Sequence, residues 1–137
     1  MTTAENLWAD AEVISTYSRE QAIEDGTLVD LCQDELGRLV KEAGFKFSVA
    51  CTSAVFFSCI GMTEAAERAG NDMHGRLWDI LWMLKIAIRR GGNGDRISFQ
   101  VLVVRDVETP TLTELLAVCG PGDDASPVIT IMFPEEE

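Results

Sequence analysis

The sequence contains a single histidine, His74, among its 137 residues. A Ser-His-Asp or Cys-His catalytic arrangement therefore has only this residue to use, and a metal site with two imidazole ligands is excluded. His74 stands in the segment "NDMHGR", beside Asp72 and a short distance before Asp79. We interpret it as a loop histidine near the start of a helix, without a catalytic role.

Cysteine is scarce as well, and its spacing fits no common site. The four cysteines, Cys32, Cys51, Cys59 and Cys119, form neither a CxxC pair nor a zinc-binding pattern. The start of the chain, "MTTAENLWADAE", is acidic and lacks the apolar core of a secretory signal peptide. We therefore expect a cytoplasmic protein whose thiols are reduced and buried.

No apolar run is long enough to cross a bilayer. The longest, "LWDILWMLKIAI", is interrupted by Asp79 and Lys85, whereas a membrane helix needs about 20 predominantly apolar residues. The sequence thus predicts no membrane segment.

Positive charge is scarce at the start of the sequence and missing from its last part. Residues 1–35 carry nine acids against one base, Arg19, and the chain from Asp106 onward carries eight acids and no base. Residues 36–105 hold ten bases and six acids, and the net charge of the chain is -12. Such a charge repels phosphates, so we expect neither direct nucleic-acid binding nor binding to an anionic membrane. If the two ends meet in space, one face is strongly negative.

The length predicts a single domain over residues 1–137. A first helix is expected after the N-cap Ser18, ending at Gly26, and a second over residues 32–44. Residues 76–90, "RLWDILWMLKIAIRR", are apolar on most of the helical circumference and predict a central buried helix.

The same helix carries two patterned sets of side chains. Arg76, Asp79 and Arg90 fall on one strip, which is the face expected to meet solvent or a partner. Trp78 and Trp82 share another face and are expected in the core.

In the second half of the sequence the hydrophobic pattern changes from the period of a helix to the two-residue period of a strand. Residues 96–106 alternate as a strand, residues 111–120 are ambiguous between helix and strand, and residues 127–133 form a strand with two largely apolar faces. Residues 45–61 fit a strand that runs into a helix capped by Thr52 or Ser53. We predict an α+β fold with N-terminal helices packed on a small C-terminal antiparallel sheet.

Three segments, "YSREQAIEDGTLVDL", "GRLWDILWMLKIAIRR" and "GPGDDASPVITIM", cover much of the chain. They resemble the recurrent blocks of a family of small uncharacterised proteins carried on bacterial plasmids, phages and other mobile elements. The resemblance favours a strand at residues 111–120. It implies a mobile-element setting and supplies no catalytic residues.

Because the N-terminal and C-terminal segments of the sequence are both acidic, we predict a non-enzymatic interaction protein. It would inhibit or modulate a host nucleic-acid-binding or defence protein. A carboxylate face would imitate a phosphate array and occupy a basic groove. The expected partner is a basic protein encoded by the host or by the mobile element. The sequence is also compatible with a homodimer. The predicted acidic face consists of Asp10, Glu12, Glu24, Asp25, Asp123, Asp124, Glu135, Glu136 and Glu137. Residues 135–137 are expected to form a flexible tail after Pro134.

The alternative is a small nucleotide-binding domain or enzyme that uses the "YSREQAIEDG" block. Its predicted ligand pocket consists of Tyr17, Arg19, Asp30, Arg76 and Asp79. No cofactor and no metal are predicted, because Asp123 and Asp124 lack the spacing of a cation site and fit turn chemistry.

Overall fold

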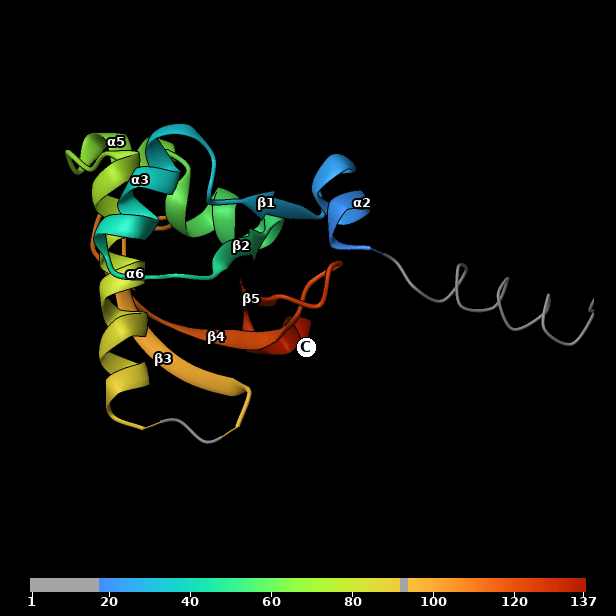
Figure 1. Cartoon of the computed structure of the whole chain (residues 1–137). Coiled ribbons are helices and arrows are strands. Elements are labelled where there is room, and N and C mark those ends of the chain that lie inside the picture. Colours follow the sequence, from blue (N-terminus) through green and yellow to red (C-terminus); the bar gives the residue numbers. More distant parts are fainter. Residues whose placement is uncertain (1–17, 92–93) are drawn as a thin grey trace, which may run out of the picture.

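A five-stranded mixed sheet runs through the part of the chain that the computed structural model describes, residues 18–91 and 94–137 (Figure 1). The strands lie in the order β1-β2-β5-β4-β3. They are β1 (Leu28–Asp30), β2 (Ser48–Thr52), β3 (Arg96–Val103), β4 (Thr111–Pro121) and β5 (Pro127–Met132). The helices are α2 (Arg19–Glu24), α3 (Asp34–Glu42), α4 (Ser53–Val55), the π-helix η1 (Phe56–Ile60), α5 (Glu64–Arg68), α6 (Met73–Arg89) and the 3-10 helix η2 (Pro134–Glu136).

The predicted ends of the first helices are confirmed. The Ser18 side chain accepts a hydrogen bond from the backbone N–H of Gln21, whose own side chain accepts from the Ser18 N–H. This capping box satisfies two N–H groups that the first helical turn leaves open. Gly26, which follows α2, has a φ of +85°, a conformation that favours glycine. Thr52 caps α4 through a bond from the Val55 N–H.

The last three strands form the antiparallel meander that the sequence predicts. β3 pairs with β4, and β4 pairs with β5, both antiparallel. The ambiguous segment, residues 111–120, is a strand because it lies between two strands that hydrogen-bond both of its edges. β5 lies inside the sheet, as its two apolar faces predict.

The α+β class is confirmed, but the predicted arrangement of the sheet is wrong in two respects. β1 and β2 come from the N-terminal half, and β2 pairs parallel with β5, with Val49 opposite Ile129. The segregation of helices before strands is therefore only partial, and the sheet is mixed. Val49, Ala50 and Cys51 are all buried. A strand that is buried on both faces is an apolar run without alternation. The period of its sequence therefore does not indicate which strands it pairs with.

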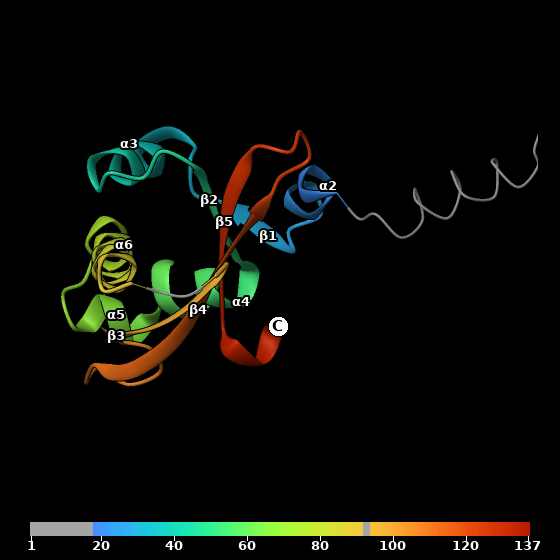
Figure 2. The ribbon, with the colours of Figure 1, turned by 60° about the horizontal axis from the view of Figure 1, so that its bottom comes forward.

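α6 covers one side of the sheet and provides one wall of the core. In Figure 2, α3 and α6 lie on one side of the sheet, and the C-terminus lies on the other. Leu77, Ile80, Leu81 and Leu84 are at most 1% exposed and join the core cluster with strand residues such as Ile131.

The expectation that α6 is buried nearly all round is wrong, because only one face of the helix meets the core. Trp82, Met83 and Ile88 are exposed. Trp78 packs against the edge of the core and stacks on Trp82, with 6.1 Å between ring centroids. Apolar residues on several faces of a helix therefore do not show how many of those faces are buried in the fold.

The three C-terminal glutamates do not form the predicted flexible tail. Residues 134–136 are helical in η2, and the Glu136 carboxylate accepts from the Phe133 N–H and from the Thr52 hydroxyl, each at 2.8 Å. Glu137 pairs with Arg96. The glutamates remain exposed, but their carboxylates fasten the chain end to β2 and β3.

Truncation of a core residue of α6 tests this packing. Leu81→Ala is expected to lower the free energy of unfolding by about 2–5 kcal/mol, because Leu81 is completely buried and its loss leaves a cavity. The neighbouring change Trp82→Ala removes a larger side chain that is 43% exposed, and it should cost about 1 kcal/mol or less. Urea denaturation of both variants provides the measurement. A larger cost for Trp82→Ala would contradict the orientation of α6.

Candidate functional site

The turn between β4 and β5 is fastened to the start of α2 by one carboxylate. The two oxygens of Asp123 accept from the backbone N–H groups of Arg19 and Glu20, at 2.9 and 3.0 Å. These hydrogen bonds lower the pKa of Asp123, because they favour its charged form. Two acidic segments that are more than a hundred residues apart in the sequence thereby meet at one end of the molecule. We call this region the acidic end; it comprises Glu20, Glu24, Asp25, Asp123 and Asp124.

The base within the acidic end, Arg19, is directed into the fold. Its Nη1 donates to the Thr130 hydroxyl at 2.6 Å, and its Nη2 donates to the Ile129 carbonyl at 2.9 Å. Burial lowers the pKa of Arg19, while the nearby carboxylates of Asp30 and Asp123 act in the opposite direction. The terminal nitrogens of Arg19 are therefore occupied by acceptors of β5.

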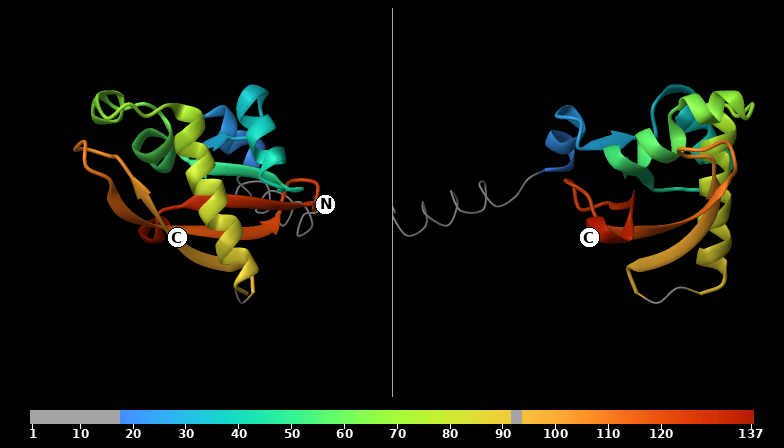
Figure 3. Two further views of the ribbon diagram at one scale, coloured as in Figure 1. Left: turned by 90° about the vertical axis from the view of Figure 1, so that its left-hand side faces the viewer. Right: turned by 180° about the vertical axis from the view of Figure 1, so that it is seen from behind.

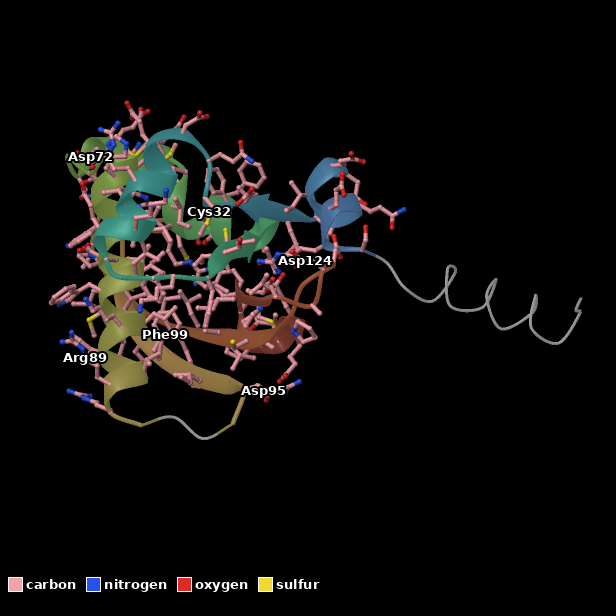
Figure 4. All side chains as sticks on the ribbon, in the orientation of Figure 1. Cys32, Asp72, Arg89, Asp95, Phe99 and Asp124 are labelled. Atoms are coloured by element: carbon pink, nitrogen blue, oxygen red, sulfur yellow. The ribbon has the colours of Figure 1, made fainter. Side chains whose placement is uncertain are left out.

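The structure divides the predicted acidic face between the two ends of β5. Glu24, Asp25, Asp123 and Asp124 are exposed at the acidic end, before β5 begins. The C-terminal glutamates follow the other end of β5, in and after η2. Asp10 and Glu12 lie outside the described residues. In Figure 4, Asp124 lies on the side of α2, across the molecule from Arg89 at the end of α6.

The predicted ligand pocket is divided as well. Arg19 and Asp123 line a groove of about 750 Å³ beneath α2, together with Leu28 and Val128. Asp30 is near Arg19, but its carboxylate accepts from the Cys32 N–H and from the Gln33 side chain. Tyr17 lies outside the described residues.

Arg76 and Asp79 line a separate pocket of about 250 Å³, whose other walls include Cys59 and Leu102. The expected strip of Arg76, Asp79 and Arg90 is accordingly wrong for Arg76, which is 5% exposed. Asp79 and Arg90 are exposed, and desolvation raises the pKa of Asp79.

Arg76 is the buried cation of the core. Its guanidinium donates to the carbonyls of Ile60 at 3.1 Å, Val104 at 2.8 Å and Ser58 at 3.1 Å, and to the Asn71 amide oxygen at 3.4 Å. The planar fork of arginine carries donors on three nitrogens and can reach acceptors that lie apart, whereas a lysine donates from one nitrogen only. A helical period places this residue on the strip with Asp79, so the sequence carries no signal that the side chain turns inward.

The four thiols are free, and they differ in exposure. Burial raises the pKa of Cys51 to about 12 and also raises the pKa of Cys59. Cys32 is exposed, which contradicts the prediction that all four thiols are buried, and Cys119 is half-buried. Cys32 lies between the buried Leu31 and the exposed Gln33, so its immediate neighbours did not decide its exposure.

His74 is in the first turn of α6, and its Nε2 lies 3.0 Å from a carboxylate oxygen of Glu35 on α3. Both side chains are largely exposed. Within the described ranges, no three His, Cys, Asp or Glu side chains are grouped so that they could hold a metal ion. None of the described helices is long and apolar enough to cross a membrane.

A further groove, which the sequence did not indicate, runs between α6 and the edge strand β3. Its larger part, about 660 Å³, is lined by Met83 and Ile86 on α6, by the C-cap Arg90 and by residues 96–100 on β3. The pocket of Asp79 and Leu102 lies along the same helix and strand, toward the N-terminal end of α6. The apolar residues Met83 and Leu102 are exposed in this region. Their positions on the predicted helix and strand could have indicated the groove, but the prediction did not include them.

Comparison with known proteins assigns the chain to a family. Residues 4–137 match the Family of unknown function (DUF6573), and the chain belongs to this family. No curated protein matches the chain, and no solved structure does.

Removal of the buried guanidinium tests its structural role. Arg76→Ala is expected to lower the free energy of unfolding by about 3–5 kcal/mol, because it leaves buried carbonyls without donors. Arg38→Ala, on the exposed surface of α3, should change it by less than about 0.5 kcal/mol. Equal costs in urea denaturation would contradict the structural role of Arg76.

Thiol labelling tests the environments of the cysteines. A maleimide at neutral pH should modify Cys32 in the native protein and leave Cys51 and Cys59 unmodified, since the thiolate is the nucleophile and burial disfavours it. Mass spectrometry of peptides identifies the modified sites, and labelling in urea provides the control. Rapid native labelling of Cys51 would contradict its burial.

Proposed function

We propose that the protein is a non-enzymatic interaction module whose acidic end binds a basic protein partner. The observation that carries this proposal is the pair of hydrogen bonds from Asp123 to the start of α2. They hold carboxylates from both sequence ends on one surface, while the guanidinium of Arg19 is engaged inside the fold. A surface of one sign attracts a partner of the other sign and accelerates their association.

The proposed partner is a nucleic-acid-binding or defence protein of a bacterial host, met in the cytoplasm by a protein carried on a mobile element. Its basic groove would ordinarily hold phosphates. Carboxylates on a folded surface offer acceptors of the same charge sign, so the acidic end would compete with nucleic acid for that groove. The interaction would weaken with added salt, because exposed charges are screened.

A nucleotide ligand in the groove beneath α2 is the second candidate, favoured by the size of that groove and by Arg19 in its lining. Both terminal nitrogens of Arg19 already donate to Thr130 and Ile129. These are the atoms that would bind a phosphate, so the interaction module is the better supported reading. A rise in melting temperature with nucleotides would favour the second candidate.

Charge reversal at the acidic end tests the first proposal. The double variant Glu20→Lys with Glu24→Lys should weaken binding to the basic protein recovered from host lysate by about tenfold or more at low salt. Glu42→Lys with Glu67→Lys provides a control with the same change of net charge on α3 and α5. Affinity is measured with the purified pair at low and high salt.

Two outcomes contradict the proposal. One is the absence of any basic protein from the low-salt recovery. The other is an equal loss of affinity in both double variants, which would show that net charge alone governs binding.

A further inference from the structure

β3 is a long edge strand without the usual protection. It has eight residues and pairs with β4 on one side only, and within the described part of the chain no strand covers its other side. Natural edge strands are commonly shortened, bulged or protected by proline and charge. β3 contains no proline, its register with β4 is unbroken, and Arg96 at its first position is its one charged residue. The opposite edge strand, β1, has only three residues.

The register identifies the backbone groups that β3 leaves open. The Cys119 N–H donates to the Asp95 carbonyl at 2.8 Å, and Arg96 lies opposite Val118. In an antiparallel pair, hydrogen-bonded and non-hydrogen-bonded positions alternate. Positions 97, 99, 101 and 103 therefore direct N–H and C=O toward β4. Positions 96, 98, 100 and 102 direct theirs to the open edge.

The groove beside this edge has an ordered lining on the helix. Asp79, Met83, Ile86 and Arg90 follow one another at spacings of four, three and four residues and so form one stripe of α6. Arg90 lines the groove near the start of β3, and Asp79 lines the smaller neighbouring pocket near the end of β3. In the left view of Figure 3, α6 crosses the sheet and β3 forms the outer edge of it.

The strand and the stripe are each self-complementary when taken antiparallel to themselves. An antiparallel copy of β3 centred on Phe99 places Arg96 opposite Leu102 and Ser98 opposite Gln100, so every open backbone group finds its counterpart. The stripe on α6, taken antiparallel to itself, places Asp79 opposite Arg90 and Met83 opposite Ile86. Phe99, at the centre of the proposed strand pairing, and Met83, in the middle of the stripe, line the same groove.

The ends of the stripe are suited to pairing between copies. Among the described residues, neither Asp79 nor Arg90 has an ion-pair partner. Met83 is 37% exposed and Leu102 is 61% exposed in the single chain. A second copy would cover both apolar residues and would bring opposite charges together at both ends of the contact.

We propose that β3 pairs antiparallel with β3 of a second copy, so that two five-stranded sheets join into one and the α6 stripes face each other across a two-fold axis. An isologous interface requires one patch to fit itself, and the arrangement of charges on the stripe meets that requirement. An unrelated extended peptide would satisfy the backbone of β3 but would not account for the symmetric order of Asp79 and Arg90. The inference is independent of the acidic end, which uses α2 and the β4–β5 turn.

A proline on β3 tests the strand pairing. The full chain should sediment as a dimer in analytical ultracentrifugation. Ser98→Pro removes an N–H that β4 does not use, so the monomer should keep its circular-dichroism spectrum while the dissociation constant of the dimer rises at least about tenfold. Ser98→Ala keeps the N–H and is expected to leave the dimer intact.

A charge exchange tests the helix contact. Asp79→Arg alone and Arg90→Asp alone should each weaken the dimer, because each places like charges opposite each other. The double variant restores opposite charges and should recover the dimer. Arg89→Asp, on the neighbouring position outside the stripe, should have no effect on the dimer.

Three outcomes would overturn the proposal. They are a wild-type chain that stays monomeric at high concentration, a dimer that tolerates both Ser98→Pro and the single charge changes, and a monomer that binds an unrelated peptide in a manner blocked by Ser98→Pro. The last would assign the β3 edge to a different occupant.

Discussion

The buried guanidinium of Arg76 is the constraint on which much of the fold depends. It joins the end of η1, the first turns of α6 and the backbone just after β3 through carbonyl acceptors. Carbonyls at a helix end require donors once water is excluded, and a single arginine provides several in one plane. Among the described residues no carboxylate pairs with this cation, and its donors meet fixed oxygen atoms instead. This attachment, together with the core packing of Leu77, Ile80, Leu81 and Leu84, holds α6 over the sheet beside β3.

A second constraint is the central place of β5. It is the last strand in the sequence, yet it lies between β2 and β4 and pairs with both. The acidic turn therefore stands at one end of β5 and the glutamates of η2 at the other. Because β5 is inside the sheet, the β4–β5 turn is carried to α2, where Asp123 closes the acidic end. The position of β5 between β2 and β4 thus determines where these two groups of carboxylates lie on the surface.

The two proposed surfaces use different parts of this framework. The acidic end lies where α2 meets the β4–β5 turn, whereas the β3 edge lies on the other side of the sheet order. A two-fold dimer through β3 would present two acidic ends, one from each copy. Two linked carboxylate surfaces would bind an extended basic groove more tightly than one surface alone, if their separation matched that groove.

Local patterns in the sequence determined the caps of α2 and α4, the strands β3 and β5 and the acidic character of both sequence ends, whereas β4 stayed ambiguous between helix and strand. These depend on neighbouring residues: Ser18 and Gln21 bond within one turn, and Phe99, Val101 and Val103 share a face by the period of a strand. The tertiary structure alone decided the parallel pairing of β2 with β5, the inward turn of Arg76 and Arg19, the exposure of Trp82 and Cys32, and the helical end of the chain. The physical reason is that the hydrophobic period of a helix or strand shows which side chains share a face. Which of these faces is buried depends on the elements that pack against it, and those elements are distant in the sequence.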